Sequence, residues 1–92
     1  MKRNARVAFN ALKKIGAPVF ESTDYGFFGI SAEDNVDETW ADFYEAPRLE
    51  RFTVPGGKLV WKSGVSPKIT DILEANGLHA EWINPGMLGV YE

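Results

Sequence analysis

Apolar residues at helical spacing mark a first helix near the start of the chain. Five of them fall on one stripe of a helix: Val7, Ala8, Ala11, Leu12 and Ile15. Asn4 is the expected N-cap, because a short amide side chain can accept a hydrogen bond from the first turn. Gly16 supplies the left-handed conformation that commonly ends a helix. The pattern predicts a helix over residues 4–15.

A second helix is predicted in the last third of the chain. Ser66 can serve as its N-cap, and Pro67 fits the first helical position, where no backbone N–H is needed. Asn76 and Gly77 provide the stop. The apolar stripe of this helix consists of Ile69, Ile72 and Leu73.

A pair of strand signals follows each helix. The four predicted strands are residues 18–22, 26–31, 79–83 and 87–91. Residues 23–25 and 84–86 separate the members of each pair. Asp, Asn, Pro and Gly in these connections are typical of tight turns, so two hairpins are expected.

The segment between the first hairpin and the second helix is predicted to hold further elements. Residues 32–37 are polar and indicate a loop. Asp37 is a candidate N-cap for a short helix over residues 38–45, which Pro47 prevents from continuing. Residues 51–54 and 58–62 flank a Pro-Gly-Gly run and predict a middle hairpin.

The order helix, strand, strand occurs twice, which suggests an internal repeat of residues 4–31 and 66–92 around an insertion at 32–65. With one gap after the helix, the identical pairs are Leu12 and Leu73, Gly16 and Gly77, Glu21 and Glu81, Gly26 and Gly86, and Gly29 and Gly89. Because both the register and the gap are free to vary, five identities favour a duplication as a hypothesis. The matched glycines occupy a helix stop, a turn and a strand, where glycine has structural uses.

The repeat predicts a fold class and a pairing. We expect an α+β fold in which two αββ units form an antiparallel sheet, related by a pseudo-twofold axis, with the two main helices on one face. If each hairpin loop has three residues, Glu21 lies opposite Gly29 and Glu81 lies opposite Gly89. A carboxylate would then face a strand glycine in both units.

Composition limits the protein class. Ninety-two residues fit a single domain, 1–92, and a hydrophobic share of 45% fits an ordinary globular core. The net charge of −3 argues against general attraction to nucleic acid or to an anionic membrane. The chain has no cysteine, which excludes disulfides and thiolate chemistry and favours a reducing cytoplasm. No apolar run is long enough to span a membrane, and the charged start is not a secretory signal.

An acidic and aromatic segment is the first candidate site. Its acidic residues are Glu33, Asp34, Asp37, Glu38, Asp42 and Glu45, and its aromatic residues are Trp40, Phe43 and Tyr44. One interpretation is a partner-binding surface in which aromatic anchors sit inside an acidic rim facing a basic protein surface, or one that mimics nucleic-acid phosphates. The alternative, which we weight more heavily, is an amphipathic helix with its aromatic stripe in the core and its acids in solvent. The candidate partner contacts are Asp34, Asp37, Glu38, Trp40, Asp42, Phe43 and Tyr44.

A basic patch lies at the start of the first helix, at Lys2, Arg3 and Arg6. Positive charge at this end opposes the helix dipole, so it calls for a partner. The candidates are phosphate groups of a nucleic acid, the acidic segment of the same chain, or the acidic segment of a second copy. A solvated, frayed chain start is the plainer interpretation.

A third candidate is a polar site at Glu21, His79 and Glu81. His79 and Glu81 share one face of a strand and could form an acid–base pair. Glu21 and Glu81 could meet at the pseudo-twofold axis and bind a divalent cation. Solvated strand residues are the favoured interpretation. The sequence has no catalytic or phosphate-binding motif, so no cofactor and no metal are predicted.

The strand aromatics could instead form a stacking platform for single-stranded nucleic acid; they are Phe27, Phe28, Trp61, Trp82 and Tyr91. The acidic balance argues against it. We therefore expect a non-catalytic protein-binding module, with a nucleic-acid binder and a small enzyme as alternatives. The general character suits an accessory protein of a phage or mobile element that modulates a host protein, and exposed hairpin edges make a homodimer an open alternative.

Overall fold

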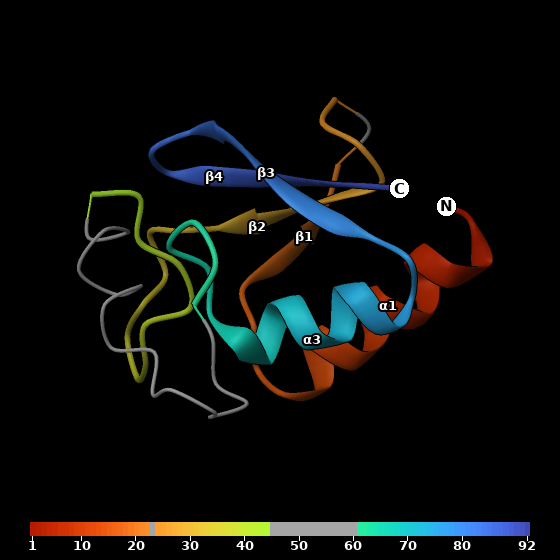
Figure 1. Cartoon of the computed structure of the whole chain (residues 1–92), viewed down its shortest axis with the longest axis horizontal. Coiled ribbons are helices and arrows are strands. Elements are labelled where there is room, and N and C mark those ends of the chain that lie inside the picture. Colours follow the sequence, from red (N-terminus) through yellow and green to blue (C-terminus); the bar gives the residue numbers. More distant parts are fainter. Residues whose placement is uncertain (23, 45–60) are drawn as a thin grey trace.

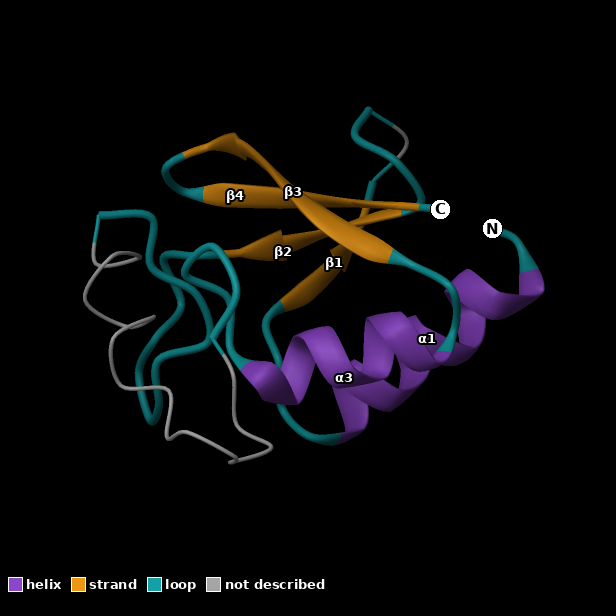
Figure 2. Ribbon diagram, viewed as in Figure 1, coloured by secondary structure: helices purple, strands orange, loops and turns teal. Residues whose placement is uncertain are grey.

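The computed structural model describes residues 1–22, 24–44 and 61–92, which form two layers (Figure 1, Figure 2). A four-stranded antiparallel sheet forms one layer, and two helices cover one of its faces. The elements are α1 (Arg3–Lys14), β1 (Val19–Glu21), β2 (Phe28–Ser31), α3 (Pro67–Ala75), β3 (His79–Asn84) and β4 (Met87–Tyr91). The predicted α+β class, antiparallel sheet and helix placement are confirmed.

The sheet order is β1-β2-β4-β3, so the two αββ segments meet at the central pair β2 and β4. Gly29 lies directly opposite Gly89 in this pair. A twofold axis between these two glycines would exchange β2 with β4 and β1 with β3. The arrangement is therefore one that a duplicated unit would adopt, whereas the duplication itself stays a prediction.

The outer strand pairs differ in register. Glu81 lies opposite Gly89, as predicted, but Phe20 takes the place opposite Gly29 that was predicted for Glu21. β1 ends at Glu21 and β2 begins at Phe28, so the connection is longer than the three residues assumed. The Phe20 ring covers Gly29 so closely that an added Cβ would lie 2.3 Å from its Cζ atom. Because a slip of one residue exchanges the two faces of a strand, Glu21 lies on the helix side of the sheet.

The core lies between the helices and the sheet. Its fully buried large side chains are Leu12, Phe28, Ile30, Ile69, Leu73, Leu88 and Val90. The Phe9 ring packs edge-on against the Phe28 ring, with their centroids 5.3 Å apart. The predicted stripe of α1 is partly wrong, because Val7 and Ile15 are about half exposed while Ala5 and Phe9 are buried. The helix is rotated so that the large Phe9 ring enters the core.

The helix ends match the predictions at α3 but not at the start of α1. Ser66 accepts a hydrogen bond from the Lys68 backbone N–H at 3.2 Å and caps α3. Lys2, not Asn4, is the N-cap residue of α1, and no side chain caps this end. Asn4 lies within the helix, and its amide donates to the Asn76 carbonyl and to a Glu92 carboxylate oxygen, both at 3.0 Å.

The helix predicted over residues 38–45 is absent from its described part, residues 38–44. Ala41 instead pairs with Val65 in a short antiparallel bridge. Ser66 N–H donates to the Trp40 carbonyl at 2.8 Å, and Asp42 N–H donates to the Gly64 carbonyl at 2.9 Å. The backbone groups of residues 40–42 thus bond to residues 64–66. They are therefore not paired within a helix, and this part of the segment is extended. The middle hairpin predicted at 51–54 and 58–62 lies almost entirely outside the described residues.

Neither helix in the described ranges has the length and apolar character needed to cross a membrane.

The fold predicts that Gly26 tolerates alanine far less well than Gly77. Both have φ = +71°, but an added Cβ at Gly26 would lie 2.1 Å from the Val90 carbonyl oxygen, whereas Gly77 has open space. Gly77→Ala should cost about 1–3 kcal/mol from backbone strain alone. Gly26→Ala should cost at least about 1 kcal/mol more because β4 must also move. Equal free energies of unfolding in urea titrations would contradict this account.

Candidate functional site

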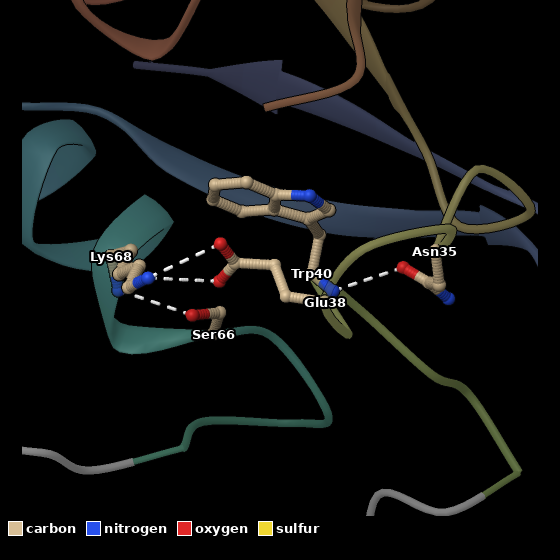
Figure 3. Close-up of polar contacts among 5 residues, drawn as sticks. All are labelled: Asn35, Glu38, Trp40, Ser66 and Lys68. Atoms are coloured by element: carbon tan, nitrogen blue, oxygen red, sulfur yellow. Dashed lines mark hydrogen bonds and ion pairs between the residues drawn. The ribbon is translucent and has the colours of Figure 1, made fainter. Parts of the chain in front are cut away.

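Asn35 and Trp40 fix the acidic segment against the fold. The side-chain oxygen of Asn35 accepts from the Trp40 backbone N–H at 2.9 Å (Figure 3). Its amide nitrogen donates to the carbonyls of Ala32 and Ala41 at 3.1 and 3.0 Å. One side chain thus ties together three points of the loop. Trp40 itself is buried, so it anchors the segment rather than offering a contact to a partner.

The Trp40 ring and a neighbouring ion pair join this segment to α3. Lys68 lies on α3, and its ammonium contacts both carboxylate oxygens of Glu38 at 3.0 and 3.2 Å (Figure 3). The same ammonium lies 5.7 Å from the centroid of the Trp40 ring, within the range of a cation–π contact. Both charged groups of this pair remain partly exposed, so solvent screens their attraction.

Three aromatic rings next to this anchored segment contact one another and are called here the aromatic cluster: the exposed Phe43 and Tyr44 and the partly buried Trp82. Phe43 packs edge-on against Trp82 at 5.3 Å and against Tyr44 at 5.6 Å between centroids. The indole N–H of Trp82 donates to the Ser63 carbonyl at 2.7 Å, which fixes that ring. Phe43 is 43% exposed and Tyr44 is 77% exposed.

The predicted partner contacts therefore divide into three groups. Trp40 belongs to the core and Glu38 to the ion pair with Lys68. Asp34 and Asp37 are exposed acids, while the Asp42 carboxylate accepts from the Tyr44 backbone N–H at 3.1 Å. Phe43 and Tyr44 remain as exposed aromatics. Trp82 completes the cluster; in sequence it is a strand aromatic with nothing to link it to Phe43.

The basic patch pairs with carboxylates of the same chain, though not with the acidic segment. The Lys2 ammonium lies 2.6 Å from the Glu92 carboxylate, and the Arg6 guanidinium lies 2.9 Å from that of Glu21. Arg3 is exposed. The hydrogen bond from Lys2, then that from Asn4, then the charge of Lys2 lower the pKa of Glu92 below its ordinary value of 4.5.

The structure brings together only part of the predicted polar site. His79 Nε2 lies 3.4 Å from Glu81 Oε1 on the uncovered face of the sheet, with both side chains at least half exposed. The His79 ring lies 6.1 Å from the Tyr91 ring. Glu21 pairs with Arg6 on the helix side, so it does not meet Glu81. In the described parts of the chain, no three acidic or histidine side chains are grouped so as to hold a metal ion.

The predicted stacking platform is also divided between environments. Phe28 is fully buried, Phe27 and Trp82 pack against the core, and Trp61 is half-buried. Tyr91 lies over Gly89 on the opposite face, where its ring comes within 3.0 Å of an added Cβ. These rings do not form one exposed row.

The surface of the described residues includes two hollows of different size. The larger, about 870 Å³ and wide open, lies between α1, β1 and the connection that follows β1, and includes Arg6, Phe20, Glu21 and Tyr25. The smaller, about 130 Å³, lies between α3, β3 and residues 62–65. Comparison with protein-family models, curated proteins and solved structures finds no match for the chain.

The contacts of Glu92 predict a loss of stability in acid. Because its pKa is lowered in the folded chain, ionised Glu92 stabilises the fold above pH 4.5, and this contribution disappears as the pH falls through the lowered pKa. Glu92→Gln should lower the Tm at neutral pH and match the wild type in strong acid. Thermal unfolding followed across this range checks the prediction; a Tm difference that does not change with pH contradicts it.

The burial pattern predicts that alanine substitution destabilises the fold strongly at Trp40 and only slightly at Tyr44. Trp40→Ala should cost about 3–5 kcal/mol, because it empties a buried site. Tyr44→Ala, at a side chain that is 77% exposed, should cost less than about 0.5 kcal/mol. Urea unfolding of both variants measures the difference, and similar losses in the two would show that Trp40 is not an anchor.

Proposed function

We propose that this chain is a non-catalytic binding module that docks onto a basic surface of another protein through the aromatic cluster and modulates that protein. The observation that carries the proposal is the exposure of Phe43 and Tyr44 beside a rigidly anchored segment. The exposed Phe and Tyr rings present apolar surface to solvent, and this surface does not contribute to the buried core. Aromatic side chains of this kind contribute much of the binding energy at protein interfaces.

Rigidity supports this interpretation. The Asn35 hydrogen bonds, the buried Trp40 ring and the Ala41–Val65 bridge fix the backbone up to the cluster. The edge-on contact with Trp82 then restricts the Phe43 ring. A surface that is ordered before binding loses less conformational entropy when a partner arrives, so more of the contact energy appears as affinity.

Charge supports a basic partner. Asp34 and Asp37 are exposed on the loop that leads to the cluster, and the whole chain carries a net charge of −3. Acidic groups around an apolar centre accelerate association with a basic surface and disfavour acidic partners. By contrast, Lys2 and Arg6 are already paired with carboxylates, which weakens the case for a nucleic-acid contact.

We also propose that the two αββ units arose by duplication and that the insertion at 32–65 supplies most of the docking surface. The symmetric strand order and the Gly29–Gly89 pair support the duplication. The position of Phe43 and Tyr44 within the insertion supports its role.

The test compares partner capture by three proteins. The double variant Phe43→Ser, Tyr44→Ser should lose the partner that the wild type retains, while its unfolding free energy changes little. Val36→Ser is the matched control, because Val36 is an apolar side chain of the same segment that is 89% exposed and lies outside the cluster.

We expect the wild type and Val36→Ser to capture the same partner and the double variant to lose it. Raising the salt concentration should slow the association of the wild type, since screening weakens attraction between surface charges. Identical captured proteins for all three chains would refute the proposal.

A further inference from the structure

β3 is the outer strand on one side of the sheet, and its free edge lies above α3 (Figure 1). Val90 of β4 accepts a hydrogen bond from Phe27 N–H on the β2 side. Backbone groups in an antiparallel strand alternate in direction, so Ala80, the β3 partner of Val90, directs its N–H and C=O away from β4. The same alternation directs those of Trp82 outward.

These four backbone groups point away from the sheet, as a further strand would require. Within the described residues, no backbone hydrogen bond reaches Ala80 or Trp82 from outside the sheet. The pairing with β4 is regular from His79 to Trp82 and shifts only after it, between Trp82 and Asn84. The pairing is therefore uninterrupted for four residues, which is enough for the outer edge to pair with a short extended segment.

The smaller hollow opens next to this edge on the helix side. Its apolar floor is formed by Val65, Leu73 and Leu78, all nearly fully buried. Ala80 and Trp82, whose backbone groups form the free edge, also line it. An apolar cavity of about 150 Å³ can hold a benzene molecule. The 130 Å³ pocket therefore fits one aliphatic side chain and is too small for a drug-sized ligand.

The charges around the edge favour a basic occupant. The cations Lys62 and Lys68 are each paired with a carboxylate, from Glu74 and Glu38 respectively. Glu81 is exposed on the opposite face of β3 from the pocket. In an added strand, successive side chains point to opposite faces of the sheet. An aliphatic residue directed into the pocket would thus be followed by a residue beside Glu81, where lysine or arginine fits.

We propose that the β3 edge binds an extended segment of the partner protein in which aliphatic and basic residues alternate. The segment adds a fifth strand next to His79–Trp82, places one aliphatic side chain in the pocket and directs a basic side chain to Glu81. Main-chain hydrogen bonds supply affinity, and the pocket and carboxylate supply selectivity. This inference rests on the proposed binding function. It adds the β3 edge to the aromatic cluster as a second surface that contacts the partner.

The probe is a seven-residue peptide of alternating lysine and leucine with both ends blocked, titrated into the isotope-labelled wild type. Amide resonances of residues 79–82 and of Leu73 and Leu78 should shift, with a Kd below about 1 mM. A peptide with glutamate for lysine, and one methylated at alternate backbone nitrogens, should both bind at least about tenfold more weakly.

Two variants separate the edge from the pocket. Ala80→Pro removes an outward N–H without removing a hydrogen bond to β4, and proline is tolerated on edge strands. Thr70→Leu fills the pocket from α3, and Thr70→Ala is its matched control. We expect Ala80→Pro and Thr70→Leu to raise the Kd at least about tenfold, and Thr70→Ala to leave it within about twofold. Because the wild-type titration needs no variant, the test holds even if Ala80→Pro unfolds.

Each other outcome overturns the inference. An absence of shifts at millimolar peptide shows that the edge does not bind such a segment. Shifts confined to Phe43 and Tyr44 would leave the proposed function standing and remove the edge from it. Concentration-dependent shifts at residues 79–82 without peptide would show that a second copy occupies the edge. The variant Phe43→Ser, Tyr44→Ser should keep its affinity for the peptide. A result that contradicts binding by the aromatic cluster can therefore be distinguished from one that contradicts binding by the β3 edge.

Discussion

The pairing of β2 with β4 is the contact on which the rest of the fold depends. These two strands lie at the centre of the sheet although the long segment between residues 31 and 87 separates them in the chain. Their helix-facing side chains, Phe28, Ile30, Leu88 and Val90, are all fully buried. Closing so long a loop costs entropy, which only the burial of this apolar face can offset. Each helix then packs on a surface that neither half of the chain forms alone.

The opposite face of the same pair explains the one error in the strand register. Gly29 and Gly89 leave this face without side chains at the centre of the sheet. The Phe20 ring fills the space over Gly29, which gains more apolar burial than Glu21 could at that position. Glu21 is then directed to the helix side, where Arg6 lies within reach. The turn residues at 23–25 could not specify this register, because the competing contact is with the face of a neighbouring strand.

Sequence predictions succeeded where neighbours in the chain decide the structure. The cap at Ser66, the stop at Gly77 and the turn at Pro85 and Gly86 are local, and α3 and the β3–β4 hairpin follow from them, although β3 runs one residue further than predicted, to Asn84. The helix predicted over 38–45 failed because distant groups compete for the backbone of that segment. Val65 pairs with Ala41 in the middle of the segment, and the Asn35 side chain bonds to the backbone of Trp40 and Ala41.

The same difference limited prediction of the candidate site. A helix would have placed Trp40, Phe43 and Tyr44 on one face, so that all three would be core or all three exposed. In the extended segment Trp40 enters the core and the other two rings face solvent. The neighbour that completes the cluster, Trp82, lies on a strand near the end of the chain. The sequence therefore indicates the segment as a candidate site, but it does not show that Trp40 is buried while Phe43 and Tyr44 are exposed.

The two edges of the sheet are unequal, and this inequality locates the proposed binding surface. β1 has only three residues, so that edge is short, and the side chain of its last residue, Glu21, pairs with Arg6. β3 has six residues, a free edge and a pocket beneath it. Among the described residues, the aromatic cluster touches β3 through Trp82, and no such ring contact involves β1. The proposed binding surface is therefore asymmetric although the strand order is symmetric, because Phe43 and Ser63 both contact Trp82 of β3.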